Sequence, residues 1–199
     1  MRRFALLVLC SIAASACAQT SSWLDQPLTD WNATLASVPM ASPGANKSED
    51  WDLCGGNIRK PSGANDEAVV AHGWRLFGQP RTFEKLSVIQ AMTGVDHTCR
   101  PLGFQAFMFQ GKRFLGTLAP IPMNARTDGA LDGMVFPSAS HITIDAHGYV
   151  VQAYFERYAK EDATCCASGV TRVSYLLAGP PKQPHVAASA VLTGKTPGN

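Results

Sequence analysis

The chain carries little charge. Its 199 residues include 17 Lys and Arg and 15 Asp and Glu, so that only 16% of residues are charged and the formal net charge is +2. Without Arg2 and Arg3, which belong to the N-terminal leader described below, 15 basic residues remain against 15 acidic ones. A chain with no excess of positive charge has no general attraction for nucleic acid or for anionic lipid. We therefore expect no nucleic-acid partner and no charge-driven contact with a membrane.

Long apolar runs and familiar catalytic motifs are also missing. After the leader, no apolar stretch is long enough to span a bilayer. The sequence contains no G-x-S-x-G, no H-E-x-x-H and no glycine-rich phosphate loop, and no pair of carboxylates stands out from the surface acids. Because no C-x-x-C pair exists either, the sequence predicts no zinc site. We expect neither a metal nor a cofactor.

The N-terminus has the pattern of a secretory signal. A charged start at residues 1–3 is followed by a short apolar stretch at 4–14 and then by small residues. We interpret residues 1–18 as a signal peptide and predict that the mature chain lies outside the cytoplasm.

The cleavage site has two interpretations. An A-x-A pair ending at Ala18 would release a free protein that begins at Gln19. Alternatively, cleavage before Cys17 would make this cysteine the lipidated first residue, although Ala14 stands where such a lipobox usually carries Leu. We favour lipidation at Cys17, which would be the sole link to a membrane. Both interpretations remove Cys10 with the leader.

Four cysteines remain in the mature domain, and in an exported protein four cysteines typically form two disulfides. Three connectivities exist. We favour Cys54 with Cys99, and Cys165 with Cys166 as a vicinal pair. A crossed arrangement stays open, because a bond between adjacent cysteines is strained.

The clearest β pattern surrounds Gly111, where two runs of aromatic and branched residues flank a short turn, which is typical of a hairpin. The first run is apolar on both faces, with Ala106 and Met108 on one side and Phe107 and Phe109 on the other. A strand of this kind needs cover on both faces, so we place it in the middle of a sheet.

Alternation predicts further strands at 86–92, 141–145 and 149–158, and a last strand with Val173, Tyr175 and Leu177 on its core face. A helix is predicted at 66–71. The fold class is α+β, mainly an antiparallel meander of about five or six strands with one or two short helices. The predicted organisation is a flexible tether at 19–50 with a short helix at 29–37, a domain at 51–178 and a disordered tail at 179–199.

A candidate binding loop lies at 119–139, because structureless loops of this length are uncommon unless they are functional or disordered. The candidate binding residues are Arg126 and Asp128, which lie in this loop, and Arg157, which lies with Arg100 beside other turns or strand ends. Either these arginines form ion pairs that fix the loop to the sheet, or Arg126 and its loop bind an anionic ligand or a partner.

Three sequence pairs have reactive side chains. His97 with Cys99 would suit a nucleophilic site, but neighbours two apart in a loop rarely hold that geometry. Asp145 with His147 would suit acid–base chemistry and is more typical of a polar hairpin turn. The vicinal pair Cys165–Cys166 would suit a redox switch, since a strained disulfide is easily reduced.

Three segments together resemble one family. Phe-Met-Phe-Gln-Gly-Lys-Arg-Phe-Leu-Gly-Thr at 107–117, Tyr-Ala-Lys-Glu-Asp-Ala-Thr-Cys-Cys-Ala-Ser at 158–168 and Val-Ser-Tyr at 173–175 resemble the LppP/LprE family of bacterial envelope lipoproteins. The match covers roughly residues 50–178, and Ala163 and Ala167 stand where the family commonly has Pro. The resemblance implies an exported, lipid-anchored protein and no particular activity.

The expected function is therefore that of a cell-envelope protein, periplasmic or anchored in the outer membrane, which acts as a non-catalytic binding or structural module. The expected partner is another envelope protein or a cell-wall component. The alternative is a periplasmic thiol-redox or hydrolytic enzyme that uses Cys165 and Cys166, or His147.

Overall fold

The computed structural model describes residues 21–43, 48–136, 150–163 and 165–196. The predicted signal peptide with Cys17, the strand predicted at 141–145, and the pair Asp145 and His147 lie outside the described residues. Within them the fold is α+β, as predicted, and it consists mostly of antiparallel strands with a few short helices.

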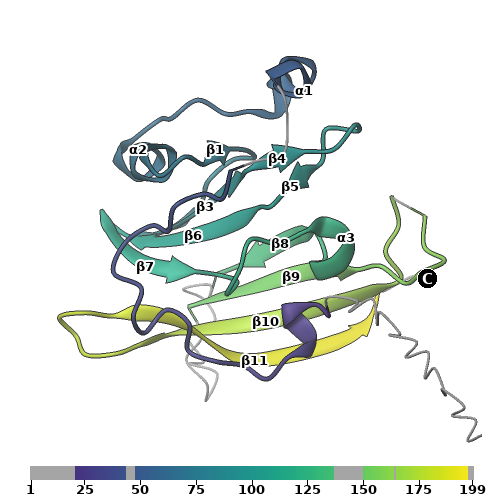
Figure 1. Ribbon diagram of the computed structural model, residues 1–199. Coiled ribbons are helices and arrows are strands. Elements are labelled where there is room, and N and C mark those ends of the chain that lie inside the picture. Colours follow the sequence, from purple (N-terminus) through teal and green to yellow (C-terminus); the bar gives the residue numbers. More distant parts are fainter. Residues whose placement is uncertain (1–20, 44–47, 137–149, 164, 197–199) are drawn as a thin grey trace, which may run out of the picture.

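Two main sheets replace the single meander that we expected (Figure 1). The first sheet has the order β1(Arg75–Leu76), β3(Leu86–Met92), β6(Gln105–Gln110), β7(Arg113–Thr117), and β2(Arg81–Phe83) also pairs with β3. The second sheet has the order β11(His185–Lys195), β10(Gly169–Ala178), β9(Val151–Arg157), β8(Leu131–Val135). A separate two-stranded ribbon joins β4(Gly94–Val95) and β5(Pro101–Leu102). Alternation along a strand identifies the strand but not its neighbours, which is why the sequence did not reveal two sheets.

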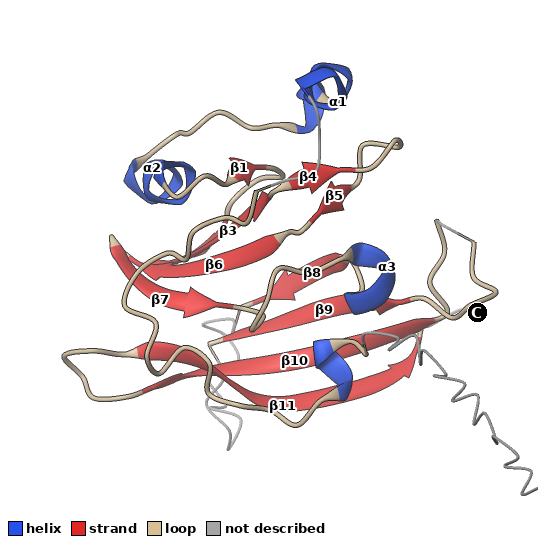
Figure 2. Ribbon diagram, in the orientation of Figure 1, coloured by secondary structure: helices blue, strands red, loops and turns tan. Residues whose placement is uncertain are grey.

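The helices of the described residues are short: α1(Ser48–Leu53), α2(Ala64–Ala71), α3(Ala125–Asp128), with 3₁₀ turns η1(Trp23–Asp25) and η2(Gly55–Asn57). Helix α2 includes the predicted helix, and Asp66 and Glu67 lie in its first turn, where negative charge is favourable. It covers one face of the first sheet, and the second sheet covers the other (Figure 2). The helix predicted at 29–37 is not present; that segment forms turns.

Strand β6 is buried on both faces, as predicted. Phe107 and Phe109 pack in a cluster with Val69 of α2. Ala106 and Met108 face the opposite way, into a larger cluster that lies between the two sheets. The described residues therefore form two cores, one on each side of the first sheet.

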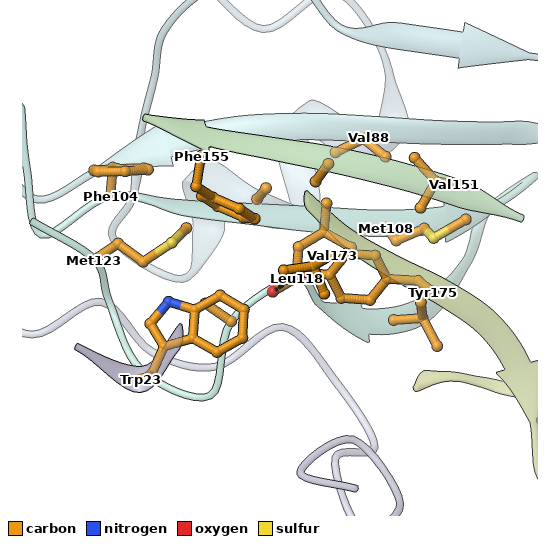
Figure 3. Close-up of a cluster of buried hydrophobic side chains, with 14 of the residues drawn as sticks. Trp23, Val88, Phe104, Met108, Leu118, Met123, Val151, Phe155, Val173 and Tyr175 are labelled. Atoms are coloured by element: carbon orange, nitrogen blue, oxygen red, sulfur yellow. Dashed lines mark hydrogen bonds between the residues drawn. The ribbon is translucent and has the colours of Figure 1, made fainter. Parts of the chain in front are cut away.

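The second sheet is buried on one face only. Val151, Ala153 and Phe155 of β9 are fully buried, and the residues between them are half-buried, so the predicted alternation is confirmed. Figure 3 shows Val88 and Met108 of the first sheet among the same buried side chains as Phe155.

The alternation of β10 is confirmed only in part. Val173 and Tyr175 belong to the larger core, and the Tyr175 hydroxyl donates a hydrogen bond to the carbonyl of Leu118. The prediction for Leu177 is wrong, because its side chain is 36% exposed, while Thr171 is buried instead. Strand β10 runs past the edge of the core at its C-terminal end, so the alternation continues there without cover.

The segment predicted to be a flexible tether packs on the domain. Trp23 and Leu24 are buried in the larger core, and the ring of Trp23 meets that of Phe155 at 5.7 Å. Asn32 accepts a hydrogen bond from the amide of Thr117 at 2.9 Å and donates others to the carbonyls of Thr117 and Val186. These aromatic and amide side chains fix the segment, so the folded unit begins well before residue 51.

The predicted disordered tail contains β11, the longest strand of the described residues. It pairs with β10 from Gly169↔Lys195 to Ala178↔His185. Gly179, with a φ of +81°, starts the turn that leads into β11, so the chain turns back onto the sheet at the residue where we predicted the tail to begin. Because β11 is rich in small and β-branched residues and buries Val186, it completes the second sheet.

Candidate functional site: a groove between the sheets

A disulfide joins Cys54 and Cys99, as we predicted, with their Cα atoms 5.3 Å apart. Cys54 follows α1, and Cys99 lies in the turn between β4 and β5. Because Cys99 is oxidised, it is not a free nucleophile, and the catalytic interpretation of His97 with Cys99 is excluded.

Cys165 and Cys166 lie on the exposed connection between β9 and β10, with their sulfur atoms in contact. Asp162 organises this connection by accepting hydrogen bonds from the amides of Ala159 and Ser168 and from the Ser168 hydroxyl. The bonds to the Ser168 and Ala159 amides lower the pKa of the Asp162 carboxyl. Asp162 therefore ties together Ala159 and Ser168, which lie on either side of the vicinal cysteines.

The three residues predicted for the binding site, Arg126, Asp128 and Arg157, each have a different set of partners. Arg126 lies over the ring of Tyr158, 5.2 Å from its centre, and donates hydrogen bonds to the carbonyls of Ala159 and Asp162. The carboxylate of Asp128 accepts a hydrogen bond from the amide of Asn124, so it stabilises the start of its own helix, α3.

Arg157 lies elsewhere, on the second sheet. Its guanidinium forms an ion pair with Asp25 at 2.6 Å and donates a hydrogen bond to the Thr171 hydroxyl. Arg157 thus holds the N-terminal segment against the sheet, which is a structural role.

The long loop predicted at 119–139 has secondary structure of its own. Asn124 caps α3 by accepting a hydrogen bond from the Arg126 amide, and β8 follows. Gly129 has a φ of +89°, and a Cβ atom there would lie 1.8 Å from the carbonyl oxygen of Glu156. Only glycine allows the chain to pass this close to β9. The loop is therefore part of the second sheet.

Three adjoining cavities form a groove along the β4–β5 ribbon, and the middle one lies where the two sheets separate. The first, of about 440 Å³, lies beside Cys99 and is lined by Phe77 and Pro101. The second, of about 280 Å³, shares both of these residues and extends to β8 and β9. The third, of about 190 Å³, lies beside α3 and shares four residues with the second: Arg100, Pro101, Ala125 and Tyr158. We call these three cavities together the inter-sheet groove.

The inter-sheet groove has apolar walls and a few polar groups. Phe77 and Phe104 meet edge to face in the middle cavity, with ring centres 6.3 Å apart, and Leu131 lies on the side of β8. Tyr158 donates a hydrogen bond to the carboxylate of Glu156 at 2.8 Å. Burial, followed by this hydrogen bond, raises the pKa of the Tyr158 hydroxyl above its ordinary value.

Three arginines line the groove, and they differ in what they bind. Arg59 forms an ion pair with buried Asp66, which also accepts hydrogen bonds from Ser62. The hydrogen bonds from Arg59 lower the pKa of Asp66 to about 2, against the opposing effect of burial. Arg126 binds backbone carbonyls, as described above. The guanidinium of Arg100 has no hydrogen bond or ion pair with the described part of the chain, although its amide donates to Asp96 at 3.0 Å.

Sequence reasoning singled out Arg100 and Arg126 but did not bring them together with Tyr158. The two arginines are 26 positions apart, and only the packing of α3 against β9, across a cavity from the β4–β5 ribbon, places both beside the same tyrosine. No sequence signal marks Tyr158, which simply follows the last residue of β9.

The described residues contain no group of three metal-ligating side chains. Among their helices, none is sufficiently long and apolar to cross a bilayer. Comparisons with family models, with curated proteins and with solved structures gave no match. The resemblance to the LppP/LprE family therefore stays a prediction.

Proposed function

We propose that this protein is an exported, lipid-anchored module of the cell envelope that binds a partner in the inter-sheet groove without transforming it. The groove takes the place of the 119–139 loop as the recognition surface. The partner is another envelope protein or a cell-wall component.

The main support comes from the groove itself. Adjoining cavities with apolar walls and a few polar groups are what binding sites typically provide. The carboxylates around it are engaged in structural hydrogen bonds: Asp66 with Arg59, Asp96 with Thr98 and Glu156 with Tyr158. Groups held in this way support a shaped binding surface better than they support proton transfer.

The anchor rests on the sequence pattern of the leader and on the family resemblance. Intact-mass measurement of the protein from bacterial envelopes tests it directly. We expect lipid on Cys17 and recovery in the membrane fraction, with Cys17→Ser shifting the protein to the soluble fraction. A mature protein that begins at Gln19 and carries no lipid would overturn the anchor.

A pair of variants on α3 tests the groove. Ala125 lines two of the three cavities, whereas Thr127 on the same helix is exposed and lines none of the three. We expect chemical cross-linking in intact envelopes to capture a partner with wild type and with Thr127→Arg, and to lose it with Ala125→Arg. Equal capture by both variants, in proteins that retain the Cys54–Cys99 disulfide, would argue against the groove.

A second candidate function is thiol-redox chemistry, because Cys165 borders the middle cavity. In such a reaction a dithiol would reduce the Cys165–Cys166 disulfide, and the resulting thiols would reduce a disulfide of the substrate. Catalysed reduction of insulin by dithiothreitol that is lost in Cys166→Ser would support this enzyme and contradict a non-catalytic module.

A further inference from the structure

We propose that the inter-sheet groove binds an extended peptide segment that carries an Asp or Glu side chain, and that Arg100 binds this carboxylate. The inference rests on the proposed function, since it names the chemistry of the partner that the groove would hold. Its basis is the contrast among the three arginines of the groove.

Of the three arginines of the groove, Arg100 is the one whose guanidinium can bind a ligand without losing a hydrogen bond or ion pair within the described residues. Arg59 is neutralised by Asp66, and Arg126 is directed to the carbonyls of Ala159 and Asp162. Arg100 lines both the middle and the third cavity and has no side-chain hydrogen bond or ion pair within the described residues. A guanidinium beside apolar walls matches a carboxylate, because its planar fork donates two parallel hydrogen bonds to the two oxygens.

The acidic groups of the groove form no ion pair with Arg100 but have partners elsewhere among the described residues. The same oxygen of Asp96 accepts hydrogen bonds from the amides of Thr98 and Arg100 and from the Thr98 hydroxyl. Glu156 accepts a hydrogen bond from the hydroxyl of Tyr158. Both carboxylates therefore shape the walls of the groove, while the Arg100 guanidinium stays available.

The position of Arg100 favours a carboxylate on a side chain in the middle of a peptide over the carboxylate at the end of a peptide. The groove continues on both sides of it, through Phe77 and Pro101 to the cavity beside Cys99, and through Ala125 to the cavity beside α3. An extended peptide passes along such a groove and places an acidic side chain at its centre. The middle cavity, about 280 Å³ with Phe104 and Leu131 on its walls, suits an apolar side chain next to the acidic one.

Selection from a displayed library of random decapeptides tests this while the partner is still unidentified. The target is the processed full-length protein, with Arg100→Gln selected in parallel. The matched control is Arg113→Gln, because Arg113 is exposed at the start of β7, outside the groove. We expect wild type and Arg113→Gln to enrich peptides with an acidic residue beside an aliphatic or aromatic one, and Arg100→Gln to lose that enrichment.

A synthetic peptide of the enriched sequence and its Glu→Gln counterpart then complete a double-mutant cycle, measured by fluorescence polarisation. Replacing either the peptide Glu or Arg100 should weaken binding by about tenfold or more, and replacing both should weaken it little further. Arg100→Lys should retain part of the affinity, because it keeps the charge and loses the fork. Circular dichroism in the near ultraviolet checks that each variant folds.

The outcomes separate the two proposals. Enriched peptides without acidic residues, bound equally by Arg100→Gln, would overturn the role of Arg100 and leave groove binding in place. Failure of wild type to enrich any peptide over the bare support would overturn the peptide ligand, while the envelope cross-linking of Ala125→Arg and Thr127→Arg would still decide whether the groove binds a partner.

Discussion

The two sheets of this protein are buried in different ways. Strand β6 of the first sheet is covered on one face by α2 and on the other by the second sheet. Strand β9 of the second sheet is fully buried only on the face with Val151, Ala153 and Phe155. The first sheet is thus the middle layer of three, and the second sheet is an outer layer.

This difference explains two kinds of sequence pattern. A middle strand needs apolar residues at consecutive positions, as in β6, whereas an outer strand needs them only at alternate positions, as in β9. It also places the inter-sheet groove, because the groove opens where the outer layer separates from the middle one beside Phe77 and Leu131.

The largest expected effects come from truncating neighbours on these two strands. Phe107→Ala should lower the free energy of unfolding by about 3–5 kcal/mol and Met108→Ala by about 2–5 kcal/mol, because both side chains are buried, on opposite faces of β6. On β9, Phe155→Ala should cost about 3–5 kcal/mol but Gln152→Ala about 1 kcal/mol or less. Urea denaturation measures all four, and equal losses at Phe155 and Gln152 would contradict the one-sided burial of the second sheet.

The two cysteine pairs should differ in how much they stabilise the fold. Cys54–Cys99 links two segments beside the first sheet and spans a sequence separation of 45, so its removal in a Cys54→Ser, Cys99→Ser variant should cost about 2–4 kcal/mol. The vicinal cysteines precede β10 of the second sheet and close no long loop, so Cys165→Ser with Cys166→Ser should change stability little. Thermal and urea unfolding of both variants would show whether the two changes differ in this way.

The ion pair at the start of α2, the helix that covers the first sheet, should make the free energy of unfolding depend on pH. Asp66 at the start of α2 has a pKa of about 2, below its ordinary value of 3.8, because Arg59 donates hydrogen bonds to it. The stabilisation is therefore fully present above about pH 4 and is lost as pH falls through 2, and it amounts to about 2 kcal/mol. Asp66→Asn should remove this pH dependence, and Asp132→Asn, at an exposed position of β8, should keep it. Urea denaturation between pH 2 and 7 measures the difference.

The smallest effect is expected at the ion pair that joins the N-terminal segment to the second sheet. Arg157 contacts Asp25, whose side chain is 50% exposed, so solvent screens the pair. A double-mutant cycle with Asp25→Asn and Arg157→Gln should give a coupling below about 1 kcal/mol that falls further with added salt. A coupling as large as the Asp66 contribution would mean that this ion pair holds the N-terminal segment on the second sheet as firmly as the Arg59–Asp66 pair holds α2.

Several elements were predictable because their signals are local. Strand β3 has the predicted bounds, the turn at Gly111 joins β6 to β7, and α2 includes the predicted acidic first turn. In each case neighbouring residues carry the whole pattern, whether it is alternation, a turn residue or a favourable charge.

Other elements were missed because their order depends on contacts distant in sequence. Strand β8 has no clear alternation and is a strand because β9 pairs with it. Strand β11 follows two prolines and is ordered by its pairing with β10. The N-terminal segment is ordered by Trp23 and Asn32, whose partners lie far along the chain.

For the candidate site, the sequence indicated some of the residues but not which of them lie together. The sequence singled out Arg100 and Arg126, the latter as a candidate for binding an anionic ligand, and it favoured a Cys54–Cys99 disulfide. It also grouped Asp128 and Arg157 with Arg126, whereas in the structure Arg157 pairs with Asp25 and the carboxylate of Asp128 accepts a hydrogen bond from the amide of Asn124 at the start of α3.

By itself the sequence determined the α+β class and the middle strand β6, since these follow from residue types and their spacing, whereas it favoured the Cys54–Cys99 pair without excluding the other connectivities. Tertiary structure alone decided that the strands divide into two sheets, that both ends of the folded chain pack onto them, and that Arg100 lies beside Tyr158 in the groove. The reason is physical: periodicity fixes which face of an element is apolar, but the partner of that face is chosen by the packing of the whole chain.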